Sequence, residues 1–191
     1  GDDQIVSLFN CCMVTYKRKQ IRLKKYDYSD AGWYFVTICI QDTKCLLGDI
    51  INNQMNLNGF GNVINQYWLN IPNHFNNVEL DEYVIMPNHI HGIIVIRNSL
   101  VGARSPRPLG FPRPLLGQIV GYFKYQSTKQ INISLKGSGN PTPTKIFQRS
   151  YYEHVIRTEH DLNRIRQYIR DNPINWDRDK NNKIVQNIDD I

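Results

Sequence analysis

The stretch YVIMPNHIHGIIVI, residues 83–96, is the part of this 191-residue chain from which its fold can best be inferred. Both halves of the stretch are rich in β-branched residues, which favour strands. The dipeptide Pro87-Asn88 between them is typical of a tight turn. We therefore expect two strands, at 78–86 and 89–96, joined by that turn.

Two histidines open the second of these strands. His89 and His91 are two residues apart, so both side chains project from one face, while Ile90 points the other way. Neighbouring imidazoles on one sheet face can give two nitrogens to one divalent ion. A single pair of this kind also occurs as ordinary surface or sheet packing, so the pair alone leaves both interpretations open.

Strands and helices alternate on either side of this hairpin. The pattern predicts a strand at 33–40, a hairpin at 46–50 and 54–57, a helix at 59–71 that Pro72 stops, a helix from about 116 to 131, an extended segment at 147–156 and a helix from about 159 to 171. Residues 99–116 contain four prolines and indicate a loop. This order favours an α+β fold in which helices cover an antiparallel sheet.

Charge is distributed unevenly along the chain. The net charge is +6, yet no Asp or Glu occurs between Tyr83 and Tyr152. The basic residues of that span are Arg97, Arg104, Arg107, Arg113, Lys124, Lys129, Lys136, Lys145 and Arg149. A second basic cluster lies at 17–25. This pattern favours a surface that binds nucleic acid with a salt-dependent affinity.

The cysteines and the hydropathy pattern bear on the setting. Cys11, Cys12, Cys39 and Cys45 form no Cys-x-x-Cys pair, which argues against a structural zinc site. They suggest no disulfide framework, so we expect a reduced, cytoplasmic setting. No stretch of 18 uncharged apolar residues occurs, and we expect no membrane-spanning helix.

Four stretches, in this order, resemble the histidine–hydrophobic–histidine (HUH) single-tyrosine transposases, and more narrowly the REP-associated tyrosine transposases of bacteria. They are RLKKYDY at 22–28, YVIMPNHIHGII at 83–94, FQRSYYEHVIR at 147–157 and YIRDNP at 168–173. The resemblance as a whole covers residues 18 to about 176. The resemblance implies a ferredoxin- or RRM-like HUH endonuclease fold and a nucleoid-associated protein. We accordingly expect an N-terminal extension at 1–16, a catalytic domain at 17–176 and a polar tail at 177–191.

The resemblance also implies roles for individual residues. Tyr168 takes the position of the family's nucleophile, and Mg²⁺ or Mn²⁺ is expected on His89, His91 and Asn172. Tyr168 and Asn172 are four residues apart, so they share one face of the last helix. The family usually has Gln where this chain has the shorter Asn172. The implied reaction cleaves and rejoins single-stranded or hairpin DNA of short palindromic repeats through a 5′-phosphotyrosine, in a monomer or a homodimer.

Basic residues near the quoted stretches are candidate DNA contacts. They are Arg149, Arg157, Lys124, Lys24 and Lys25. His154 could help to place the ion or the DNA, or could be a hydrogen-bonded structural histidine. Two other functions remain open: a catalytically silent DNA-binding protein of the same fold, and a metal nuclease that uses water in place of tyrosine.

Overall fold

The computed structural model describes residues 31–97, 115–137, 139, 145–179 and 182. The elements in chain order are β1 (Gly32–Cys39), η1 (Gln41–Thr43), β2 (Gly48–Ile51), β3 (Gln54–Leu57), α2 (Gly59–Leu69), α3 (Ile71–His74), β4 (Val78–Ile85), β5 (His89–Ile96), α4 (Leu116–Gly137), β6 (Tyr152–Ile156), α5 (Glu159–Asp171) and η2 (Trp176–Arg178).

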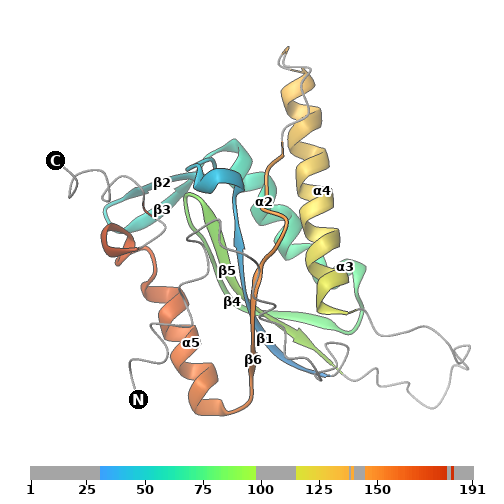
Figure 1. Ribbon diagram of the computed structural model, residues 1–191, viewed down its shortest axis with the longest axis vertical. Coiled ribbons are helices and arrows are strands. Elements are labelled where there is room, and N and C mark those ends of the chain that lie inside the picture. The colour runs from blue at the N-terminus through green and yellow to red at the C-terminus, as the bar shows by residue number, and fades with distance from the viewer. Residues whose placement is uncertain (1–30, 98–114, 138, 140–144, 180–181, 183–191) are drawn as a thin grey trace, which may run out of the picture.

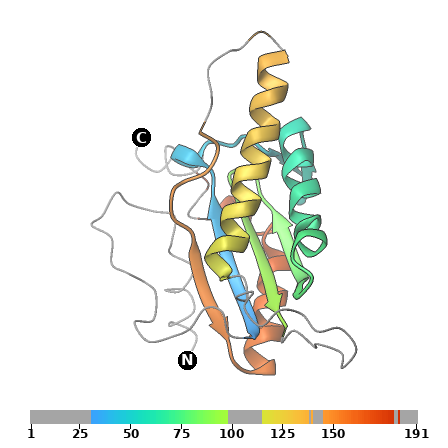
Figure 2. The same cartoon turned by 90° about the vertical axis from the view of Figure 1, so that its right-hand side faces the viewer.

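Four strands form one antiparallel sheet in the order β4-β5-β1-β6, and β2 and β3 pair as a separate hairpin. Helices α2 and α4 lie against one face of the sheet, and α5 lies against the other (Figure 1). Turning the molecule shows α4 and α2 in front of the strands and α5 behind them (Figure 2). The predicted α+β fold, an antiparallel sheet covered by helices, is confirmed.

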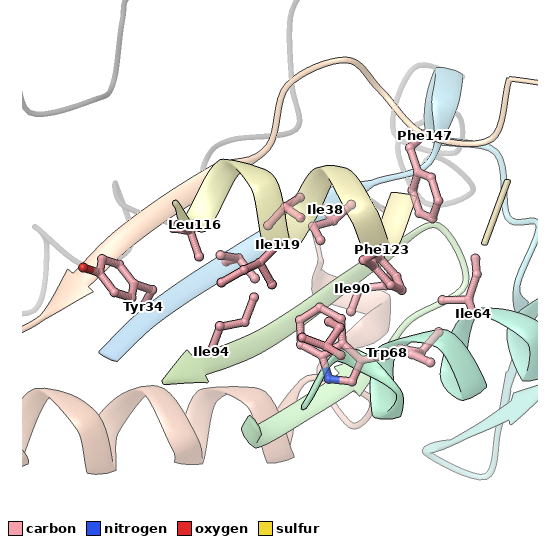
Figure 3. Packing of buried hydrophobic residues seen from close by; sticks show 14 of the residues in the cluster. Tyr34, Ile38, Ile64, Trp68, Ile90, Ile94, Leu116, Ile119, Phe123 and Phe147 are labelled. Atoms are coloured by element: carbon pink, nitrogen blue, oxygen red, sulfur yellow. The ribbon is translucent and has the colours of Figure 1, made fainter. Parts of the chain in front are cut away.

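Strand β5 is buried along its whole length, and its side chains alternate between two apolar cores. Ile90 and Ile94 enter the larger core, where they pack with side chains of α2 and α4 such as Trp68 and Phe123 (Figure 3). Ile93 and its neighbours on that side pack against α5 in a second core. The histidines are separated from Ile93 by an even number of residues, so their side chains lie on the same face of β5 as Ile93. They therefore face α5.

Helix α5 begins and packs as its sequence indicates. Thr158 caps its first turn, because its side chain accepts a hydrogen bond from the backbone N–H of Asp161. Leu162, Ile165 and Ile169 form the buried stripe and contact the second core. The helix ends at the predicted residue, Asp171.

Three local predictions differ from the structure. Helix α4 continues to Gly137, beyond the predicted end near 131, and Leu135 in this extension packs against the larger core one turn after Ile131. Helix α2 ends at Leu69, two residues before the predicted end at 71, and Pro72 lies in the first turn of the separate short helix α3, where proline is tolerated. Of the extended segment 147–156, only β6 is a strand of the sheet, although Phe147 forms an isolated bridge with Ile40.

Of the described cysteines, Cys45 is free and exposed, and Cys39 is buried in β1. Among the residues that the structure describes, no helix combines the length and the apolar character needed to cross a membrane. The predicted loop at 99–116 lies almost wholly outside the described residues.

A substitution at Gly92, next to His91, tests how tightly the register of β5 is fixed. A Cβ atom there would lie 2.3 Å from Cζ2 of Trp68, a fully buried ring that has no room to retreat. We expect Gly92→Ala to lower the free energy of unfolding by about 1–3 kcal/mol, as measured by urea denaturation.

The matched control for this substitution is Gly121→Ala on α4. A Cβ atom at Gly121 would meet nothing within 4 Å, so the alanine should leave stability unchanged or raise it by up to about 1 kcal/mol. Equal stability of the Gly92 variant and the wild type would contradict the tight packing of Trp68 on β5.

Candidate active site

The two histidines of β5 lie side by side under α5. The exposed fractions are 0% for His89 and 1% for His91, and the ring centroids are 4.5 Å apart. Nδ1 of His89 lies 2.8 Å from Oδ1 of Asn88, and Nδ1 of His91 lies 2.9 Å from Oγ1 of Thr37. These contacts orient both rings and leave each Nε2 for other partners.

Tyr168 extends from α5 to this pair. Its hydroxyl lies 3.2 Å from Nε2 of His91, and the two ring centroids are 5.2 Å apart. Phe35 of β1 meets the tyrosine ring edge-on, with a centroid distance of 6.2 Å. The structure thus places the tyrosine beside the histidines of its own chain, across 77 residues of sequence.

Asn172 follows Tyr168 by one turn and forms the C-cap of α5. Burial lowers the pKa of His89 and raises the pKa of Tyr168, and the Asn172 side chain opposes both shifts through contact with each group. The residue is 5% exposed, and its Oδ1 is buried without a hydrogen bond of acceptable geometry. His89, His91, Tyr168 and Asn172 are therefore gathered in one place.

Burial keeps both imidazoles neutral. It lowers the pKa of His89 to about 4, against opposing effects of the Asp179 charge and the Asn172 side chain. Burial, followed by the proximity of His89, holds the pKa of His91 well below its usual value. Neutral imidazole is the form that binds metal ions, so neither ring must lose a proton first at neutral pH.

Burial has the opposite consequence for the phenol. It raises the pKa of Tyr168, and the negative charge of Asp179 raises it further, while Asn172 lowers it. The Tyr168 hydroxyl is thus protonated at neutral pH. A positive charge placed at the histidines would lower the pKa of this hydroxyl and strengthen it as a nucleophile.

The donor set fits a divalent ion. Nε2 of His89 and Oδ1 of Asn172 are both buried without a hydrogen bond, and each such atom costs about 1–3 kcal/mol unless a ligand satisfies it. Two imidazole nitrogens and an amide oxygen suit Mn²⁺, and the oxygen also suits Mg²⁺. Within the described ranges, no three His, Cys, Asp or Glu side chains form a group that could hold a metal ion.

Asp179, a residue of the segment expected to form the polar tail, lies at this site. Its Oδ2 is 3.8 Å from Nε2 of His89. It follows η2, where Trp176 is nearly buried and its ring lies 6.2 Å from the ring of His89. No motif marked Asp179, because its position depends on the chain turning back after α5.

The predicted DNA contacts are not all at one end of the sheet. Arg149 is exposed and follows Gln148, whose backbone N–H donates to the carbonyl of Cys39, at the end of the sheet that holds His89. Arg157 is exposed and follows β6 at the opposite end. Lys24 and Lys25 lie outside the described residues.

Two other candidates have partners within the protein. Nζ of Lys124 donates to the carbonyls of Gln148 and Ser150, and burial lowers its pKa to about 8. Nε2 of His154 lies 2.9 Å from Oδ2 of Asp161 on α5. His154 therefore links β6 to the tyrosine helix and makes the contact expected of a hydrogen-bonded structural histidine.

Burial of a neutral His89 predicts that acid destabilises the metal-free protein. In the unfolded chain this histidine binds a proton near pH 6.5, but in the folded chain only near pH 4, so unfolding takes up a proton between these values. The free energy of unfolding, measured with EDTA present, should fall by up to about 3 kcal/mol from pH 7 to pH 4. His89→Gln should lose less over the same range.

His160→Gln is the control, because His160 lies on the exposed side of α5. This variant should retain the pH dependence of the wild type. A His89→Gln variant with the same pH dependence as the wild type would show that His89 is not buried in its neutral form.

A scan against protein-family models finds no match. An uncharacterized protein of Haemophilus influenzae is 40% identical over 173 residues, which cover 86% of this chain and 93% of that protein.

Among solved structures, a REP-associated tyrosine transposase bound to a REP hairpin is similar, with a TM-score of 0.51 and 19% identity, covering 86% of this chain and 74% of that one. A transposase-like protein of Deinococcus radiodurans aligns with a TM-score of 0.42 and 16% identity, over 82% of this chain and 97% of its own. The chain belongs to the same family as the Haemophilus influenzae protein, and it shares the fold of the REP-associated tyrosine transposase.

Proposed function

We propose that this protein cleaves and rejoins single-stranded or hairpin DNA, with Tyr168 as nucleophile and with Mg²⁺ or Mn²⁺ held by His89, His91 and Asn172. The observation that carries the proposal is the position of the Tyr168 hydroxyl, 3.2 Å from Nε2 of His91. Two buried polar atoms without hydrogen bonds, on His89 and Asn172, lie in the same place. A nucleophile and metal donors brought together from β5 and α5 are what this chemistry requires.

The reaction exchanges one phosphoester for another. The Tyr168 oxygen forms a bond to the phosphorus, the bond from phosphorus to the 3′ oxygen breaks, and the proton of the tyrosine ends on that departing oxygen. A bound divalent ion supplies positive charge that polarises the scissile phosphate. The product is a 5′-phosphotyrosine and a free 3′-OH, which can attack in reverse and rejoin strands without another energy source.

The surrounding sequence suits a DNA substrate. The acid-free span between Tyr83 and Tyr152 includes exposed Arg149, at the end of the sheet that holds His89. The structural relative named above is bound to a REP hairpin. By analogy, we take a hairpin of a short palindromic repeat with a single-stranded flank as the substrate class.

The tyrosine mechanism is tested by Tyr168→Phe. With Mn²⁺ and a labelled hairpin oligonucleotide from DNA beside the gene, the wild type should form a protein–DNA adduct that survives a denaturing gel. The phenylalanine variant should form none, because it lacks the attacking oxygen.

Tyr122→Phe is the control, since this tyrosine of α4 stacks on His74, away from the histidine pair. Cleavage without an adduct would instead indicate a nuclease that uses water. Hairpin binding without cleavage would indicate a catalytically silent DNA-binding protein.

The metal site is tested by direct binding of Mn²⁺, measured by calorimetry without DNA. His89→Ala should abolish binding, and Asn172→Ala should weaken it by about tenfold or more, as expected when a donor is lost. Asn62→Ala, on the exposed side of α2, should bind as the wild type does. Equal affinity of the Asn172 variant and the wild type would remove this amide from the ligand set.

A further inference from the structure

The tyrosine helix is tied to both edges of the sheet by polar contacts. On one side, Nε and Nη2 of Arg166 bind the two carboxylate oxygens of Asp81 on β4, at 2.8 and 2.6 Å. Arg170 binds Oε1 of Glu82 on the same strand through Nε and Nη2, at 3.0 and 2.8 Å. On the other side, Asp161 meets His154 of β6. Strands β4 and β6 are the two edges of the sheet.

The acceptors on β4 depend on an irregularity in that strand. Its pairing with β5 shifts register between Leu80 and Tyr83, so Asp81 and Glu82 lie in the irregular part. Consecutive residues of a regular strand point to opposite faces and could not both reach one helix. The bulge removes that restriction, and both carboxylates meet arginines of α5.

The arginines and the tyrosine lie on opposite sides of the buried stripe of α5. At about 100° per residue, Arg166 and Arg170 fall on one side of the stripe, and Asp161 and Tyr168 fall on the other. The contacts to β4 and to β6 therefore resist rotation of the helix about its axis. That rotation is the motion that would carry the Tyr168 hydroxyl toward or away from His91.

Apolar packing alone would hold this rotation loosely. The contacts of the buried stripe have no preferred direction, whereas a two-pronged arginine–carboxylate pair fixes distance and angle together. Arg166 also lies over the Trp33 ring, 5.6 Å from its centroid, and it keeps the pKa of Asp81 below its usual value, so the pair stays ionised at neutral pH. A rotation of about 10° moves a tyrosine hydroxyl by more than about 1 Å, which can cost about 100-fold in rate.

We propose that Arg166 and Asp81, supported by Arg170 and Glu82, are positioning residues that set the rotation of α5 and thereby aim Tyr168 at His91. The inference rests on the proposed function for its kinetic consequence, but the geometry can be measured without it.

The kinetic test is single-turnover adduct formation with Mn²⁺ and the hairpin oligonucleotide, well below the melting temperature. Asp81→Asn and Arg166→Gln should each lower the rate constant by about tenfold or more. The amplitude and the affinities for the hairpin and for Mn²⁺ should stay within about twofold of the wild type. The double variant Asp81→Arg with Arg166→Asp should react faster than either single variant, because it restores opposite charges at the same two positions.

Glu79→Gln is the matched control. It removes the ion pair between Glu79 of β4 and Arg97, which does not involve α5, so the rate constant should not change. Variants that lose amplitude but keep the wild-type rate constant would show that the pair only stabilises the fold. That result, or single variants that react at the wild-type rate, would overturn the proposal.

A spectroscopic test separates this inference from the proposed function. In the metal-free protein, the ¹⁵N chemical shift of His91 Nε2 reports its contact with the Tyr168 hydroxyl. Asp81→Asn should move this shift toward the value of Tyr168→Phe, whereas Glu79→Gln should leave it in place. An unchanged shift in the Asp81 variant overturns the inference. Absence of any adduct in the wild type overturns the proposed function instead.

Discussion

The burial of β5 on both faces is the constraint on which the rest of the structure depends. Alternate side chains of this strand enter two different environments: Ile90 and Ile94 fill the apolar core under α2 and α4, and the histidines face α5. A slip of one residue would exchange the two sets and bury both imidazoles among hydrocarbon side chains. The close approach of Trp68 to Gly92 adds a steric reason for this register. The site is therefore held in place by the packing of the opposite face of the sheet.

Burial of the polar groups of this site lowers the stability of the fold. Two imidazoles are removed from water, one nitrogen of each is satisfied by Asn88 or Thr37, and Nε2 of His89 is left without a hydrogen bond. A fold optimised for stability alone would not leave such an atom beside the equally unsatisfied Oδ1 of Asn172. The same burial keeps the histidines neutral and the tyrosine protonated. In the proposed reaction, the two imidazoles are already in the neutral form that binds a metal ion, and the Tyr168 hydroxyl depends for its activation on a positive charge from outside the chain.

Two kinds of contact, apolar and polar, hold helix α5 against the sheet, and they have different effects. Leu162, Ile165 and Ile169 supply the free energy that keeps the helix on the sheet. The polar contacts to β4 and β6 fix the rotation of the helix about its axis, since their partners are held at fixed angles on both sides of the buried stripe. Partly exposed ion pairs of this kind add little to stability, which is why their geometric effect is the more important one. Because the helix packs on its own sheet, the Tyr168 hydroxyl lies beside His91 of the same chain.

The sequence by itself determined the parts of this protein that depend on local patterns. The period of two in β5 placed both histidines on one face, the apolar spacing gave the bounds of α5, and the four-residue spacing put Tyr168 and Asn172 on one helical face. Only the tertiary structure decided which face of α5 meets which strand. The contacts of Arg166 with Asp81 and of Asp179 with His89 join residues 85 and 90 positions apart, as counted along the chain. Such pairs produce no periodic pattern in the sequence, because they form only when the sheet order and the β4 bulge bring separate segments together.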